Sequence, residues 1–178
     1  IQVEFNPAKV QAYRLIGYES RLLEAKDFND DTKDAGEMGA GHSVTALYEI
    51  IPVGIKSNFI PSIDPLKYQK TEKNEKKTLT DSPELLTVKL RYKQPESHKS
   101  SKMEVTIIDN NTPLKKSSEN FRFSAAVAGF GMLLQNSEYK NNFTFDDVID
   151  LAKQATNYDP EGYRKEFIRL VESAALLK

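Results

Sequence analysis

The sequence predicts an α+β fold, in which an antiparallel, sandwich-like sheet region is followed by a bundle of about three helices. Three observations support this prediction. Apolar and polar residues alternate with period two in several segments of the first 113 residues, which is typical of half-buried strands. After Pro113 the apolar period changes to that of an α-helix. Helix-capping residues then precede each apolar segment. We therefore expect a β-rich region at 1–113 and a helical region at 114–178 that packs on it as one structural unit.

Five segments of the β-rich region are predicted strands. The clearest examples are 84–93 and 102–109, where apolar residues alternate with Thr, Lys and Arg, and the Ser- and Pro-containing turn between them predicts an antiparallel hairpin. Similar patterns predict strands at 1–5, 10–18 and 43–52. Residues 20–28 are expected to form one or two helical turns. The lysine-rich segment KYQKTEKNEKKTLTD at 67–81 also carries Glu72 and Glu75, so it is expected to be a solvated loop.

Three helices are predicted by their start signals. Ser117 or Ser118 can cap a helix that runs to about Gln135 and is apolar on more than one side, with Gly129 and Gly131 allowing close approach of other groups. Thr144 and Asp147 form a capping-box sequence ahead of the second helix. The pair Asp159–Pro160 is the cap and first-turn signature of the third helix.

Composition excludes several classes of function. The net charge of −1 gives no electrostatic field that would attract nucleic acid. The absence of cysteine excludes thiol nucleophiles, disulfides and thiolate metal sites. No apolar segment approaches the ~18 residues that a membrane span needs. We therefore expect no nucleic-acid partner and no membrane span in this chain.

The acidic segment 27–42 contains the candidate site residues. Asp27, Asn29 and Asp31 alternate as calcium ligands do, and further candidate ligands follow at Asp34 and Glu37. However, Thr32 stands where a calcium loop needs glycine, and Met38 stands where it needs glutamate. Two interpretations remain open, which are a non-standard calcium site and an acidic surface loop with Asx turns.

His42 follows two glycines in a GAGH sequence, which makes it a candidate binding residue. No Lys-Ser or Lys-Thr pair follows, and the next predicted element is a strand, so a phosphate-binding loop is not indicated. Serines are present, but none lies in a Gly-x-Ser-x-Gly elbow, and two histidines without a distinguishing context do not indicate a catalytic triad. We expect no enzyme activity, no catalytic residues and no cofactor, with calcium as the alternative.

Two segments, VEFNPAKVQAYRLIGYESRLL and DFNDDTKDAGEMGAGHSVTALYEI, resemble the C-terminal region of bacterial von Willebrand factor type A proteins of the YfbK-like kind. The resemblance covers nearly all of the chain. It implies a C-terminal domain of unknown function, cut from a longer polypeptide in which a von Willebrand A domain precedes it. The Asp-x-Ser-x-Ser signature of that domain's metal site does not occur here, so no metal ligand is carried over to this chain.

The resemblance implies a function and a location. We expect a non-enzymatic structural or interaction domain that accompanies a metal-dependent adhesion domain in the bacterial cell envelope, outside the cytoplasm. Its expected partners are the von Willebrand A domain of the same polypeptide and other envelope or extracellular proteins. Residues upstream of this chain are expected to complete part of the sheet. The alternative is a self-contained module that binds calcium or a glycan through the loop from Asp27 to His42.

Overall fold

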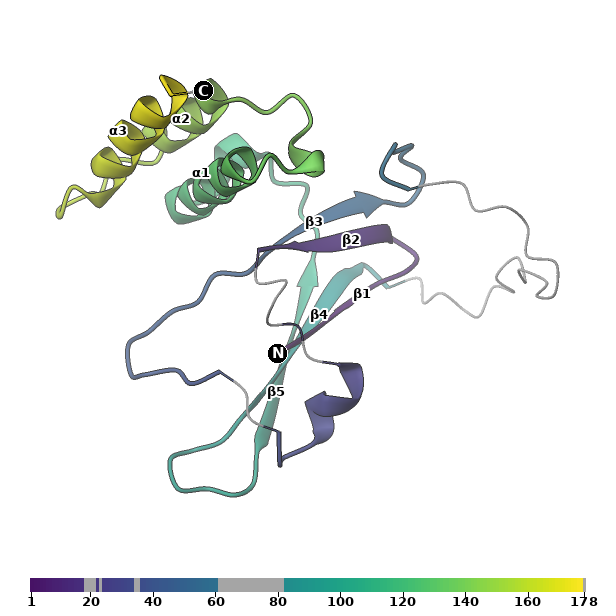
Figure 1. The fold of residues 1–178 in the computed structure, drawn as a ribbon. Helices are drawn as coiled ribbons and strands as arrows, with labels where there is room; N and C mark the ends of the chain where they lie inside the picture. Colours follow the sequence, from purple (N-terminus) through teal and green to yellow (C-terminus); the bar gives the residue numbers. More distant parts are fainter. Residues whose placement is uncertain (18–21, 23, 34–35, 61–81, 178) are drawn as a thin grey trace. The chain divides into compact units, whose positions relative to one another are not determined.

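The computed structural model describes residues 1–17, 22, 24–33, 36–60 and 82–177 (Figure 1). Two antiparallel sheets are followed by three α-helices, which confirms the predicted α+β class. The elements, in chain order, are β1 (Gln2–Phe5), β2 (Val10–Ile16), the 3-10 turn η2 (Ala25–Asn29), β3 (Leu47–Pro52), β4 (Glu84–Tyr92), β5 (Ser101–Ile108), η3 (Leu114–Lys116), α1 (Glu119–Leu134), η4 (Glu138–Lys140), α2 (Phe145–Lys153) and α3 (Tyr163–Ala175).

Contacts divide the chain into two compact units. The first comprises Ile1–Val44 and Tyr48–Asn110, and the second comprises Thr45–Leu47 and Asn111–Lys178. The first contains most of the β-structure, and the second contains the three helices. The predicted packing of the helical region on the β-rich region stays a prediction.

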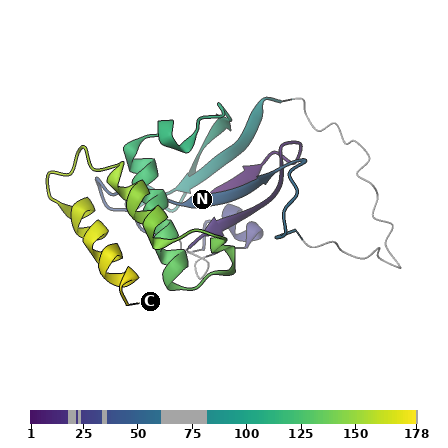
Figure 2. The same ribbon diagram turned by 90° about the horizontal axis from the view of Figure 1, so that it is seen from above.

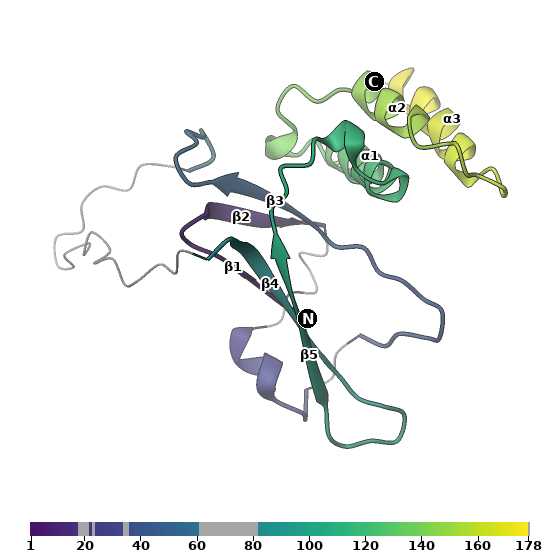
Figure 3. The same ribbon diagram turned by 180° about the vertical axis from the view of Figure 1, so that it is seen from behind.

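Three strands form the larger sheet, in the order β1-β4-β5 (Figure 3). Both pairings are antiparallel, and β4 and β5 form the hairpin that the alternation predicted. Val88 of β4 lies between Val3 and Val105, whereas its neighbour Lys89 lies between Gln2 and Glu104. Because side chains on a strand alternate between faces, the sheet has one apolar face and one polar face.

The second sheet contains β2 and β3. Arg14 Nε of β2 donates to Glu49 Oε2 of β3 at 2.6 Å, and the Val53 amide donates to the Lys9 carbonyl at 2.8 Å. Aromatic contacts join this pair of strands to β1. The Phe5 ring lies 4.3 Å from the Tyr13 ring and 5.5 Å from the Tyr48 ring, centroid to centroid. These contacts bury Phe5, which is 8% exposed.

Some predicted boundaries differ from the structure. The strand predicted at 43–52 begins only at Leu47, and Val44 is 58% exposed, so the alternation at 43–46 was misleading. The strand predicted at 10–18 ends at Ile16, and Tyr18 lies outside the described residues. The helical turn predicted at 20–28 is the 3-10 turn η2. The lysine-rich segment predicted as a solvated loop also lies outside the described residues.

The helices α1 and α2 begin at the predicted caps, whereas α3 begins at Tyr163 with Gly162 as its N-cap, so the predicted start at Asp159–Pro160 is wrong by three residues. Ser118 caps α1 by accepting a hydrogen bond from the Phe121 amide at 3.2 Å. Thr144 and Asp147 form the predicted capping box of α2, with both reciprocal hydrogen bonds present. Asp159 lies three residues before this N-cap, but its carboxylate still accepts from the Arg164 and Lys165 amides of the first turn of α3, each at 3.1 Å. Each contact satisfies an amide that has no partner within its own helix.

The three helices lie together (Figure 2) and share one apolar core. Val148 of α2 and Val171 of α3 are fully buried in it. The Phe130 ring of α1 packs edge-on against the Phe167 ring at 5.6 Å. The prediction that α1 is buried on more than one side is wrong in part, because Val127 and Leu134 are 43% and 54% exposed.

Candidate functional site

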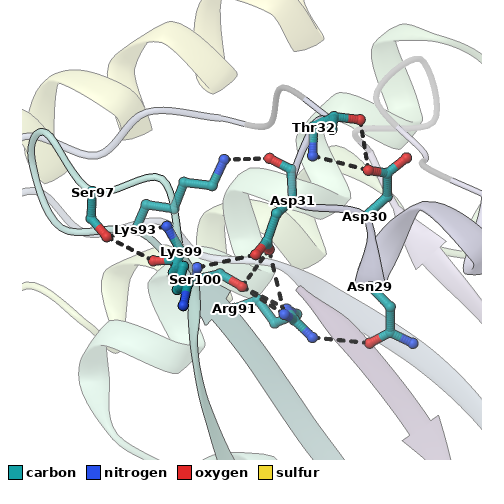
Figure 4. A network of polar contacts seen from close by, with 9 residues as sticks. All are labelled: Asn29, Asp30, Asp31, Thr32, Arg91, Lys93, Ser97, Lys99 and Ser100. Atoms are coloured by element: carbon teal, nitrogen blue, oxygen red, sulfur yellow. Dashed lines mark hydrogen bonds and ion pairs between the residues drawn. The ribbon is translucent and has the colours of Figure 1, made fainter.

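Polar contacts join the acidic loop to the β4–β5 hairpin (Figure 4). We call the residues that make them the loop clamp, namely Asn29, Asp31, Arg91, Lys93 and Ser100. Asn29 ends η2, and Asp31 follows it after one residue. Arg91 lies near the end of β4, Lys93 follows that strand, and Ser100 directly precedes β5. The loop clamp therefore joins segments that lie 60 or more residues apart in the sequence.

Asp31 is at the centre of the loop clamp. Its Oδ1 accepts from the Ser100 hydroxyl at 2.5 Å and lies 3.4 Å from Arg91 Nη2. Its Oδ2 accepts from the Ser100 amide at 3.3 Å, and its backbone carbonyl accepts from Lys93 Nζ at 2.5 Å. Arg91 also donates from Nη1 to Asn29 Oδ1 at 3.1 Å and from Nη2 to Ser100 Oγ at 2.7 Å. Two cations thus face the carboxylate and carbonyl oxygens of this loop.

The surroundings of Asp31 favour its ionised form. Hydrogen bonds from the Ser100 hydroxyl and amide lower the pKa of the Asp31 carboxyl, and the charges of Arg91 and Lys93 lower it further. A folded-state pKa below the unfolded value means that Asp31 contributes stability at neutral pH. This contribution is lost as the pH falls below about 4, through the folded-state pKa.

The other candidate calcium ligands are placed separately. Asp27 lies in η2, and its Oδ1 is 3.6 Å from Lys33 Nζ. Glu37 is exposed, and Asp34 lies outside the described residues. Asp30, which the sequence did not single out, accepts from the Thr32 amide at 2.9 Å and the Thr32 hydroxyl at 2.6 Å, which is an Asx turn.

His42 is exposed, and its ring lies beside Gly39. The His42 amide donates to the Gly39 carbonyl at 3.1 Å in a tight turn. A Cβ placed on Gly39 would lie 2.9 Å from His42 Nδ1, so glycine at this position leaves room for the imidazole. His98 is exposed in the β4–β5 loop.

Two surface depressions occur in the described part of the chain, and the polar candidates described there line neither of them. One surface depression follows α3 and is lined by Tyr163, Phe167 and Leu170, among others. Another lies beside Phe5 and Leu86. Neither is lined by His42 or by the loop clamp. Within the described ranges, no three acidic or histidine side chains are grouped so that they could hold a metal ion.

We predict that titration of the Asp31 carboxyl can be followed at the Ser100 amide if the loop clamp forms in solution. The Ser100 amide resonance should titrate with a midpoint below about 4, because that amide donates to the Asp31 carboxylate. In Asp31→Ala this titration should disappear, while the fold is retained because Asp31 lies at the surface. NMR spectroscopy of backbone amides over this pH range measures both effects.

Asp30→Ala is the matched control for this prediction. The Asp30 carboxyl also has a lowered pKa, chiefly because of its hydrogen bonds from Thr32. Removing it should abolish the titration of the Thr32 amide and leave that of the Ser100 amide unchanged. A Ser100 titration that survives in Asp31→Ala would mean that the loop clamp does not form in solution.

Sequence comparisons identify the family. A family model described as "Uncharacterized protein YfbK, C-terminal" matches residues 1–177. The protein named "Uncharacterized protein YfbK" of Escherichia coli (strain K12) is 43% identical over 173 residues, which cover 97% of this chain and 28% of that relative. No solved structure matches. Among the described helices, none is long and apolar enough to cross a membrane. The resemblance stated from the sequence is confirmed, and the chain belongs to the family of YfbK C-terminal domains.

Proposed function

We propose that this chain is a non-catalytic interaction domain. The apolar face of its three-stranded sheet would bind the von Willebrand A domain of the same polypeptide. The complex would act in the bacterial cell envelope, outside the cytoplasm. The resemblance to YfbK-like proteins supplies the expected partner and location. The exposure of the apolar β5 side chains on this face is the observation that carries the proposal.

The apolar face is formed by three columns of side chains. The column on β1 contains Val3 and Phe5, and the column on β4 contains Leu86, Val88 and Leu90. The third column lies on β5 and is defined here as the β5 column, comprising Met103, Val105 and Ile107. Contacts with β2 and β3 bury Phe5, but the β5 column is 49%, 54% and 43% exposed in chain order.

Exposure of three adjacent apolar side chains at one edge of a sheet supports a docking surface. Antiparallel sheets in globular proteins usually cover their apolar face and leave only the polar face in water. Contiguous exposed apolar side chains are typical of contact sites for other proteins. Burying the remaining exposed half of each side chain would contribute about 1 kcal/mol per residue.

The size of the relative is consistent with an internal partner. This chain spans 28% of the length of the YfbK relative, so that protein has a large additional part to which such a face could bind. An interface between domains of one polypeptide can also be modest in area, because the connection raises the effective concentration of the partner.

The arrangement of polar residues supports a non-catalytic role. Asp31 and Asn29 bond to Arg91 and Ser100 and hold two chain segments together. His42 and His98 are exposed and line neither of the two depressions described above. We do not propose that the loop binds calcium or a glycan, because the side chains of Asn29 and Asp31 are already bonded to Arg91 and Ser100.

The proposal predicts the effect of a charge placed on the apolar face. The purified chain should bind a purified von Willebrand A domain from a member of its family, measured by calorimetry. Val105→Asp should weaken this binding tenfold or more, since it buries an unpaired carboxylate in the interface, which costs roughly 2 kcal/mol or more. Val105 is 54% exposed in the free chain, so the variant should still fold.

Thr106→Asp is the matched control. It places the same residue type one position along β5, on the opposite face of the sheet. This variant should bind like the unmodified chain. Equal binding by Val105→Asp and the unmodified chain, or an absence of binding by the unmodified chain, would refute docking through the apolar face.

A further inference from the structure

A second feature of β5, its backbone edge, indicates an interaction with another copy of this chain. Within the described part of the chain, β5 pairs with β4 alone, so its other side presents unpaired amide and carbonyl groups over eight residues. Such an edge can accept another strand. This edge is distinct from the apolar face that the proposed function uses.

Pairing of β5 with itself is restricted by geometry. Two copies related by a twofold axis through the sheet pair antiparallel, and residues directly opposite each other must lie on the same face. The axis therefore passes between the two copies of one β5 residue. Four residues near the strand centre are candidates, namely Met103, Glu104, Val105 and Thr106.

Charge selects among the four registers. With the axis at Thr106, Glu104 would face Ile108, and no oppositely charged residues would be paired. With the axis at Glu104, this carboxylate would face its own copy, and like charges directly opposite are destabilising. With the axis at Val105, Lys102 would face Ile108, and no oppositely charged residues would be paired. With the axis at Met103, Lys102 of each copy faces Glu104 of the other, while Met103 faces its own copy on the apolar side.

We propose that a second copy of this chain adds its β5 antiparallel to β5, with the twofold axis at Met103. The two three-stranded sheets then form one continuous sheet across the dimer. Residues 101–105 of each copy pair, and two reciprocal Lys102–Glu104 ion pairs fix the register on the polar face.

The side chains that would form these ion pairs are accessible. Lys102 and Glu104 are 47% and 56% exposed. In the single chain, Lys102 Nζ lies 3.0 Å from Glu104 Oε2 along the same strand. In the dimer, Lys102 and Glu104 would each bond to the other copy instead of to each other. Because both side chains lie on the polar face, the apolar face stays free for the proposed interdomain contact.

Charge reversal tests the register through mixing. In sedimentation experiments over a concentration series, the unmodified chain should dimerise. Lys102→Glu should raise the dimer dissociation constant about tenfold or more, because both interchain pairs become Glu–Glu. Glu104→Lys should do the same, because both pairs become Lys–Lys.

An equimolar mixture of the two variants should recover dimers, because each heterodimer again has two pairs of opposite charge. Loss of the intrachain Lys102–Glu104 contact occurs in both variants and cannot be repaired by mixing, so recovery assigns the effect to contacts between copies. Circular dichroism verifies that each variant is folded. An unmodified chain that stays monomeric throughout the series, variants that dimerise as it does, or a mixture that stays monomeric would each overturn the proposal.

Discussion

Val148→Ala is expected to lower the free energy of unfolding by about 2 kcal/mol. Val148 lies in α2, is 0% exposed and belongs to the core that α1, α2 and α3 share. Truncation removes two methyl groups from full burial and leaves a cavity that the neighbouring side chains fill only in part. Urea unfolding followed by the helical circular dichroism signal measures the change, as a lower midpoint at an unchanged slope.

Val127→Ala is the control for this substitution. Val127 lies on α1 and is 43% exposed, so the same truncation removes less buried surface. Alanine also has a higher helix propensity than valine, which offsets part of the loss. The change should stay within roughly 0.5 kcal/mol. Equal effects at both positions would mean that the helical core is not packed as described.

Gly129→Ala should destabilise the chain by about 1–2 kcal/mol, although alanine favours a helix over glycine by about 1 kcal/mol. Gly129 is buried in α1, and a Cβ at this position would lie 2.3 Å from Phe143 Cε1. The aromatic ring would have to move, and Phe143 packs against the helical core. The strain of overpacking therefore exceeds the gain in helix propensity.

Gly131→Ala, two residues along the same helix, should have the opposite sign. A Cβ at Gly131 would meet nothing within 4 Å, so the variant should gain up to about 1 kcal/mol from helix propensity. Thermal unfolding of both variants measures the difference. Stabilisation by Gly129→Ala would contradict the close contact with Phe143.

Local sequence signals predicted much of the fold because they act over a few residues. The capping box at Thr144 and Asp147 formed as predicted, since both partners lie within one helical turn. The alternation in β4 and β5 predicted their faces and their hairpin, since strand periodicity fixes which side chains share a face. The same signal failed at 43–46, where alternating residues precede β3 without joining it.

The loop clamp could not be predicted in the same way. Its central contact joins Asp31 to Arg91 and Ser100, which are 60 and 69 residues away. The alternating pattern placed Arg91 on the polar face of β4, but no local pattern indicates which loop will meet it. Spacing among Asp27, Asn29 and Asp31 suggested a shared ligand, whereas the structure gives Asp27 a lysine partner and directs Asn29 and Asp31 toward Arg91.

The exposure of the β5 column likewise could not be predicted from the alternating pattern. Alternation predicts that Met103, Val105 and Ile107 share a face with apolar residues of β4, which is correct. It does not predict whether another element covers that face. The contacts of Phe5 with Tyr13 and Tyr48 cover the β1 column, whereas the β5 column is about half exposed.

Thiol labelling tests docking through the apolar face most directly. The chain has no cysteine, so Val105→Cys and Thr106→Cys each introduce a single reactive group, one on each face of β5. Both thiols should react readily with a maleimide in the isolated chain. When the chain is joined to the von Willebrand A domain that we propose as its partner, labelling at position 105 should slow at least tenfold, while labelling at position 106 should not change. Equal labelling at position 105 with and without that domain would contradict the account.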